Sequence, residues 1–186
     1  MFPFVRFTKT VLQSSWAYKN GETLGLTDTG ELELVANIGD IDSFLEMNNG
    51  RILTLFDLGR TDFAIKTGLG KKLLQERWGL VVAGSTVQYR KRIRLLDKVT
   101  MKTRLVALDE RWFYMEQSLW VKGVPACVAL LRTGVTNITT GKTLTTQTVL
   151  EKLGYSDVQL PVDDWVQAWI DLDSERPFPS ADTQVA

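Results

Sequence analysis

Five polar residues within ten positions give this chain its clearest capacity for chemistry. Asp40, Asp42 and Glu46 are carboxylates, while Asn48 and Asn49 carry side-chain amides, and a long apolar run follows directly. Burying such groups costs free energy unless they are paired or used in function. This stretch is therefore predicted to be the chemical site, and the rest of the chain the scaffold that positions it.

The element that follows is predicted to be a buried helix from Ile52 to Thr67. Apolar residues occupy most sides of its helical wheel, and Gly68 is a suitable C-terminal stop. The polar cluster then lies at the helix N-terminus, where backbone N–H groups and the helix dipole can stabilise a developing negative charge. Asn48 or Asn49 could cap this helix, and capping alone would account for one of the two amides.

The rest of the pattern predicts an α+β domain in which an antiparallel sheet curls around the buried helix. One strand is expected at 31–38, and a short amphipathic helix at 69–77. Segments rich in Val, Thr and aromatic residues, separated by short turns, predict four consecutive long strands over 81–93, 99–108, 111–121 and 124–138. A helix that is apolar on nearly every face must be wrapped by the sheet.

Four regions are expected along the chain. Short helices at 145–153 and 162–172 are predicted to cover the domain. The predicted regions are an N-terminal segment 1–30, the sheet-and-helix domain 31–141, C-terminal covering helices 142–175 and a disordered tail 176–186. An open flank of the sheet would expose unpaired backbone groups, so a dimer that continues the sheet is expected.

Composition excludes several classes of function. The chain has no histidine, which removes Ser-His and Cys-His nucleophile pairs and His-ligated zinc, and no metal site is expected. Lys plus Arg and Asp plus Glu both number 22, so no overall field favours nucleic acid. The single cysteine, Cys127, lies in an apolar run and is predicted to be a core residue, which fits a reducing, cytoplasmic location.

The first 18 residues allow two interpretations. They show no secretory signal, and no stretch of the chain approaches the roughly 20 apolar residues of a membrane-spanning helix. The segment could lie on a bilayer surface as a peripheral contact, or it could pack against its own domain. The second interpretation is preferred, because Arg6 and Lys9 alone make a weak basic face.

Several motifs together resemble a known family, the hotdog-fold acyl-CoA thioesterases of the 4-hydroxybenzoyl-CoA thioesterase-like group. The chain is most similar to a bacterial branch related to thioesterase superfamily member 6. The resemblance covers about Glu31 to Gly141, and it implies a hotdog fold with a thioester site at the helix N-terminus, in a cleft shared by two subunits. The motifs that carry it are Asp40-Ile-Asp42, Met47-Asn-Asn-Gly-Arg51, Asp57 with Arg60, Val87-Gln-Tyr-Arg-Lys91 and Asp109-Glu-Arg-Trp-Phe-Tyr114.

The resemblance implies catalytic roles for the polar cluster. Asp42 matches the usual catalytic carboxylate and would act as nucleophile or general base; otherwise it is a cap or turn former. Glu46 stands where many relatives have histidine, and it either takes over acid–base work or faces solvent. Asn48 and Asn49 would fix the geometry of the motif or a water molecule. Asp57 matches an acidic helix position and is either a second base or the ion-pair partner of a residue three positions on.

The resemblance also implies a CoA thioester as substrate, so no separate cofactor is expected. Arg90, Lys91 and Arg92 are the candidates for binding the CoA phosphates. In a strand, Arg90 and Arg92 would share one face and Lys91 the other; a solvated basic edge is the alternative. The expected function is hydrolysis of an acyl-CoA to free acid and CoA by a homodimer or dimer of dimers. A non-catalytic acyl or acyl-CoA binding protein is the alternative.

Overall fold

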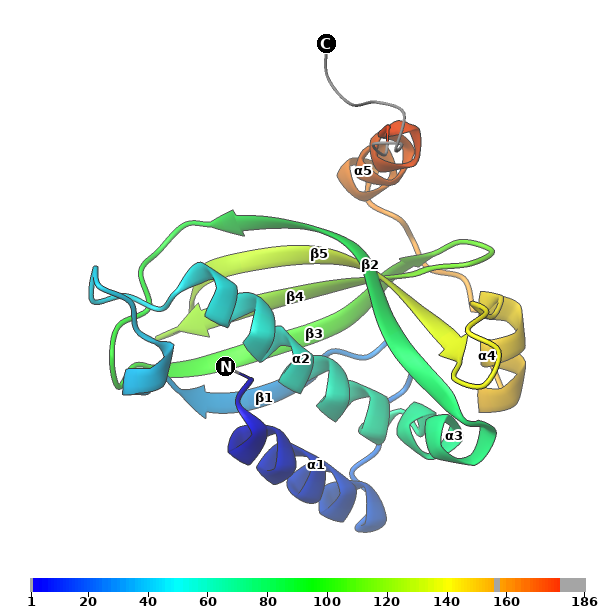
Figure 1. Ribbon diagram of the computed structural model, residues 1–186, viewed down its shortest axis with the longest axis horizontal. Helices are drawn as coiled ribbons and strands as arrows, with labels where there is room; N and C mark the ends of the chain where they lie inside the picture. The colour runs from blue at the N-terminus through cyan, green and yellow to red at the C-terminus, as the bar shows by residue number, and fades with distance from the viewer. Residues whose placement is uncertain (1, 156–157, 178–186) are drawn as a thin grey trace.

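The sheet consists of five antiparallel strands. The computed structural model describes residues 2–155 and 158–177. The strands are β1 (Gly30–Val35), β2 (Trp78–Tyr89), β3 (Lys98–Leu108), β4 (Phe113–Val121) and β5 (Val124–Asn137). They are arranged in the order β1-β3-β4-β5-β2, which leaves β1 and β2 at the edges (Figure 1). The predicted α+β architecture is confirmed.

Helix α2 (Asn49–Lys66) runs across one face of this sheet (Figure 1). Leu55 and Phe56 on this helix are fully buried. Gly59 allows the helix to approach the sheet closely, because a Cβ atom there would lie 2.4 Å from the sulfur of Met101 on β3. The predicted buried helix is confirmed, and it begins three residues earlier than expected.

Helix α1 (Phe4–Lys19) packs beside α2, near the β1 edge of the sheet, and was not predicted (Figure 1). Its Ser14 hydroxyl donates to Asp62 Oδ1 at 2.6 Å, and Lys66 Nζ lies 3.0 Å from the same oxygen. The predicted sheet curled around one buried helix is confirmed, and α1 covers part of the surface of α2 that the sheet leaves open.

Three further helices complete the domain: α3 (Leu69–Glu76), α4 (Thr146–Leu153) and α5 (Asp164–Glu175). Helices α3 and α4 pack with the start of β2 around Trp78 and Val149. Helix α5 lies on the face of the sheet opposite α2, where its buried Val166 packs with Leu130. The adjacent Leu131 faces the α2 core, as strand alternation requires.

The strand expected at 81–93 has different ends in the structure. Strand β2 begins at Trp78 and stops at Tyr89, because the N–H groups of Arg90 and Lys91 both donate to the carbonyl of Ala126, at 2.8 and 3.0 Å. Pairing cannot continue in register beyond this shared acceptor. The segment that follows β2 is a loop. The prediction that Arg90 and Arg92 share one face of a strand and Lys91 the other was therefore wrong.

Two predictions concern the membrane and the C-terminal tail. Among residues 2–155 and 158–177, none of the helices combines the length and the hydrophobicity that spanning a bilayer requires. The tail expected at 176–186 lies outside the described residues from position 178 onward.

Candidate active site

The loop before α2 is anchored by Asp40. Its side chain is 3% exposed and accepts the backbone N–H of Asn37 at 2.9 Å. Two guanidinium groups also hold it, Arg6 Nη1 at 2.7 Å and Arg51 Nε at 3.3 Å. Asp40 therefore ties α1, the loop and the first turn of α2 together, and this explains a buried carboxylate at this place.

Asp42 lies two residues on, at the rim of an open cleft. Its Oδ1 accepts the N–H of Phe44 at 2.8 Å, and its own N–H donates to the carbonyl of Glu46 at 2.9 Å. These bonds form a tight turn that fixes the carboxylate while leaving it partly exposed to solvent. The turn-forming alternative for Asp42 is thus observed, and it is compatible with a chemical role because the turn holds the side chain beside the cleft.

The start of α2 forms another wall of this cleft. Asn48 is the N-cap, and its Oδ1 accepts the N–H of Arg51 at 3.1 Å. The first N–H groups of a helix have no partner within it, so those of Asn49 and Gly50 remain available to a ligand. Gly50 lines the cleft, and a Cβ atom there would lie 3.2 Å from Asn48 Oδ1.

The cleft brings together three of the predicted site residues. It has a volume of about 490 Å³, and Asp42, Asn48 and Asp57 all line it. Glu46 and Asn49 lie outside its lining. Asp40 also lines it, but its carboxylate is held by Arg6 and Arg51. The structure therefore places the carboxylates of Asp42 and Asp57 and the open end of a helix around one space, which is an arrangement suited to polarising a carbonyl group and attacking it.

Glu46 has an ionic partner that the sequence did not indicate. Its Oε2 lies 2.9 Å from Nε of Arg92, whose side chain is 70% exposed. The N–H of Met47 also donates to the carbonyl of Ile93 at 2.8 Å. These contacts hold the loop that follows β2 against the loop that precedes α2.

The three basic residues predicted to bind CoA phosphates lie in the loop that follows β2. Arg90, Lys91 and Arg92 are all exposed, and Arg90 donates to Gln88 Oε1 at 3.2 Å. None of them lines the cleft. Arg92 is joined to the loop before α2 through its pair with Glu46.

Asp57 connects the site to a polar network inside the domain. Its carboxylate pairs with the guanidinium of Arg60, one turn along α2. Arg60 is largely buried and also donates to Gln117 Oε1 at 2.5 Å. Burial lowers the pKa of Arg60 below its ordinary value, and Asp57 counteracts that effect. The predicted ion pair is present, and it fixes Asp57 in position.

Gln117 was missed at the sequence level. It is fully buried on β4, and its Nε2 donates to the carbonyl of Phe56 and to Thr103 Oγ1, both at 2.9 Å. The network therefore joins α2 to β3 and β4. The alternation of β4 places Gln117 on the same inward face as the buried Met115 and Leu119, and this period-2 pattern could have marked it as a buried polar residue.

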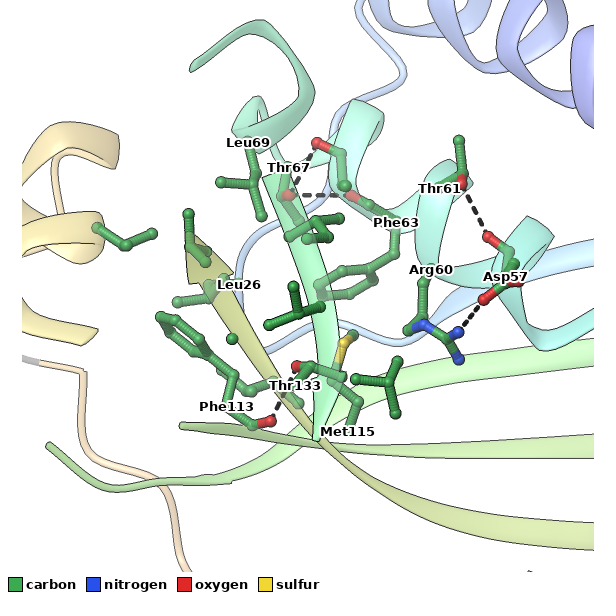
Figure 2. A pocket seen from close by; sticks show the side chains of 18 of the residues that line it. Leu26, Asp57, Arg60, Thr61, Phe63, Thr67, Leu69, Phe113, Met115 and Thr133 are labelled. Atoms are coloured by element: carbon green, nitrogen blue, oxygen red, sulfur yellow. Dashed lines mark hydrogen bonds and ion pairs between the residues drawn. The ribbon is translucent and has the colours of Figure 1, made fainter. Parts of the chain in front are cut away.

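An apolar cavity of about 350 Å³ was also missed (Figure 2). Figure 2 shows Asp57 and Arg60 at one side of it, with Leu26, Phe113 and Leu69 toward the other. Asp57 and Phe2 line both this cavity and the polar cleft, so the two spaces adjoin there. The apolar lining includes Leu26, Phe63, Leu69, Leu80, Val82, Leu105, Phe113, Met115, Val135 and Val149.

The single thiol of the chain lies outside the cleft and the apolar cavity. Cys127 is 1% exposed, and burial raises its pKa to about 12, so the prediction of a core residue is confirmed. Among residues 2–155 and 158–177, no group of three or more Cys, Asp or Glu side chains is placed to hold a metal ion.

Comparison with known sequences gives consistent matches. Residues 36–170 match the model of a family described as the thioesterase-like superfamily. Protein THEM6 of Drosophila melanogaster is 31% identical over 115 residues, which is 60% of this chain and 60% of that protein. Protein THEM6 of Danio rerio is 31% identical over 134 residues, 70% of this chain and 63% of that protein. The matches thus span less than two thirds of these relatives.

Solved structures of similar shape extend the comparison. A probable thioesterase from Bartonella henselae has a TM-score of 0.59 at 23% identity, covering 63% of this chain and 98% of that one. A Staphylococcus aureus protein solved in complex with CoA has a TM-score of 0.62 at 13% identity, covering 84% and 99%. At such identities the likeness shows the fold, and the predicted hotdog fold is confirmed.

Proposed function

Because the chain belongs to the thioesterase-like superfamily, we propose that it hydrolyses the thioester of an acyl-CoA to a free acid and CoA. One observation carries the proposal. The cleft at the start of α2 is lined by Asp42 and Asp57 in addition to the ion-paired Asp40, and it adjoins an apolar cavity at Asp57. A thioester at this junction would place its acyl group in the cavity and its carbonyl beside the helix N-terminus.

The helix start would supply the electrophilic half of the mechanism. Gly50 lines the cleft at the positive end of the helix dipole, and its N–H has no partner within the helix, so the helix start would stabilise the oxyanion that forms as the carbonyl is attacked. Asn48 accepts from Arg51, so its cap leaves this N–H available. Glycine at position 50 also keeps the approach open, since a side chain would crowd the cap.

Asp42 would supply the nucleophilic half. Its carboxylate either takes a proton from water as the water oxygen bonds to the carbonyl carbon, or attacks that carbon itself to form an anhydride that water then cleaves. In both routes the carbon–sulfur bond breaks and CoA leaves as the thiolate. In the first route the thiolate takes up the proton that Asp42 accepted from water, and in the second it takes up the proton released when water cleaves the anhydride and restores the Asp42 carboxylate. Asp57, held by Arg60, would orient the water or the thioester at the cavity mouth. No step uses Glu46, which pairs with Arg92.

The CoA moiety would extend from the cleft toward Arg90, Lys91 and Arg92. Guanidinium and ammonium groups suit its pyrophosphate and 3′-phosphate. The Glu46–Arg92 pair is exposed enough for a phosphate to compete for the guanidinium.

A homodimer, alone or paired into a dimer of dimers, would complete the site. The outer edge of β2 has no strand partner within the described chain, and it carries exposed Leu80 and Val82, which also line the apolar cavity. A second subunit paired at this edge would cover the cavity wall. The lone, buried Cys127 suits a cytoplasmic setting.

A panel of acyl-CoAs of different chain lengths tests the proposal. Release of free CoA is followed with a thiol reagent, while binding is measured separately by calorimetry. Turnover that varies with the acyl chain is expected, because the cavity has a fixed volume. Tight binding of acyl-CoA without release of CoA would overturn the proposal in favour of a non-catalytic acyl-CoA binding protein.

A further inference from the structure

Helix α1 carries apolar residues on both of its sides. The side that faces the domain buries Thr10, Ser14 and Ala17 and packs Phe7 against the α2 core. The residues that it exposes include Val5 at 85%, Leu12 at 66% and Trp16 at 67%. A surface helix ordinarily presents polar residues to solvent, so these exposed apolar side chains imply an apolar partner of their own.

The exposed apolar residues lie along one side of the helix, together with one lysine. Val5, Lys9, Leu12 and Trp16 are separated by four, three and four positions, so they lie above one another along a single side of the helix. We call these four residues the α1 stripe. Phe4, which is 68% exposed, lies next to its beginning. A tryptophan on such a stripe is typical of a helix at a membrane–water interface.

The charge of α1 favours an anionic partner. The helix contains three basic residues and no acidic residue, whereas the chain as a whole is balanced at 22 of each sign. Arg6 is engaged with Asp40 and with the carbonyl of Val35. The exposed Lys9 lies within the stripe, and the exposed Lys19 follows its end. Helices that lie in the headgroup region of anionic bilayers combine apolar and basic residues in this way.

The start of α1 also adjoins the candidate active site. The Phe2 ring lines both the cleft and the apolar cavity. Its centroid lies 5.0 Å from that of the exposed Phe4 and 5.5 Å from that of Phe7. A surface that binds the stripe would therefore lie next to the entrance of the cavity.

We propose that the α1 stripe docks on the surface of an anionic phospholipid bilayer, with its apolar side chains in the acyl boundary and its lysines at the phosphates. Docking would place the cavity entrance at the membrane surface, where an amphiphilic acyl-CoA accumulates. This route of substrate entry rests on the proposed thioesterase function, whereas the docking itself does not.

Sedimentation of the full chain with vesicles tests the docking. One vesicle preparation is phosphatidylcholine alone, and the other also contains phosphatidylglycerol. We expect binding to the anionic vesicles, and at least about a tenfold loss of partitioning when Leu12→Gln and Trp16→Gln are combined. The matched control is Leu74→Gln on α3, where the leucine is 85% exposed outside the stripe, and it should bind like the wild type. Circular dichroism confirms that each variant is folded.

The contribution of the two lysines to membrane binding can be measured separately. Lys9→Gln combined with Lys19→Gln should lower partitioning to anionic vesicles by about tenfold and leave partitioning to phosphatidylcholine unchanged. Equal losses on both vesicle types would contradict the electrostatic part of the proposal.

Three results would overturn the docking proposal: no vesicle binding by the wild type, unchanged binding by the Leu12/Trp16 variant, or conversion of a larger oligomer to a smaller one by that variant. The last result would make the stripe an interface between copies of the chain. Acyl-CoA hydrolysis without vesicles separates this proposal from the preceding one. Vesicle binding without any hydrolysis would refute the thioesterase function and leave the docking intact.

Discussion

Arg60 and Gln117 should stabilise the fold as a coupled pair rather than independently. Arg60→Met removes a charge-assisted hydrogen bond of 2.5 Å and leaves Gln117 Oε1 buried without that donor. Each effect is worth about 1 to 3 kcal/mol, so we expect a loss of about 3 kcal/mol in the free energy of unfolding. The lost pairing with Asp57 adds little, because that carboxylate is 43% exposed and solvent can hydrate it.

Gln117→Leu should cost a similar amount, about 3 kcal/mol, because it also removes the bonds to Phe56 and Thr103. The Arg60–Gln117 bond is lost in both single variants but only once in the double variant. The double variant should therefore lose about 1.5 to 2 kcal/mol less than the sum of the single losses.

Urea unfolding followed by circular dichroism measures all three variants under one set of conditions. The control is Arg104→Met, which breaks the partly exposed pair between Arg104 and Glu116 on the sheet and should cost less than about 1 kcal/mol. Losses that add within about 0.5 kcal/mol would refute the network as a coupled unit. Asp57 would then lack the support that the mechanism assigns to it.

Three further predictions concern packing, capping and titration. Gly59→Ala should cost about 1 to 3 kcal/mol of unfolding free energy in urea, because its Cβ would meet the sulfur of Met101; an unchanged midpoint would mean that α2 shifts freely. Asn48→Ala should cost about 1 kcal/mol through loss of the cap on Arg51, with Asn48→Asp restoring most of it; equal losses in both would contradict capping. The thiol of Cys127 has a pKa raised to about 12, so the folded chain keeps a proton that the unfolded chain loses near about pH 8.5. Stability from this group is thus complete below about pH 8.5 and falls as pH rises toward 12, and Cys127→Ala should lessen the decline in urea midpoint between about pH 8.5 and 10.5; identical declines would contradict it.

The elements that show helical or strand-like apolar periodicity could be predicted from the sequence. The apolar wheel of α2 and the strand-rich segments after it predicted the architecture, with shifts of a few residues at their ends. The end of β2 could not be predicted, since it depends on two N–H groups sharing the carbonyl of Ala126. Helix α1 was missed because its apolar residues lie on both sides: Phe7 faces the core beside Thr10, Ser14 and Ala17, whereas Val5, Leu12 and Trp16 are exposed, so apolar periodicity does not mark the side that faces the domain.

The candidate site was only partly accessible from the sequence. Asp42, Asn48 and Asp57 were predicted as site residues, and the structure places them around one cleft. The alternation of β4 indicates that Gln117 faces inward, but its hydrogen-bond partners and the apolar cavity depend on contacts between elements far apart in the chain and were not predicted. The pairing of Glu46 with Arg92 was missed for the same reason, since two loops must meet to form it.

The turnover of Asp42→Asn tests the central claim most directly. The matched control is Asp28→Asn, because Asp28 also accepts a backbone N–H, that of Gly25 at 2.7 Å, but lies outside the cleft. With the best acyl-CoA of the panel, Asp42→Asn should lower kcat by at least about 100-fold, while Asp28→Asn should remain near the wild-type rate. An Asp42→Asn enzyme that turns over like the wild type would remove this carboxylate from the reaction and contradict the proposed mechanism.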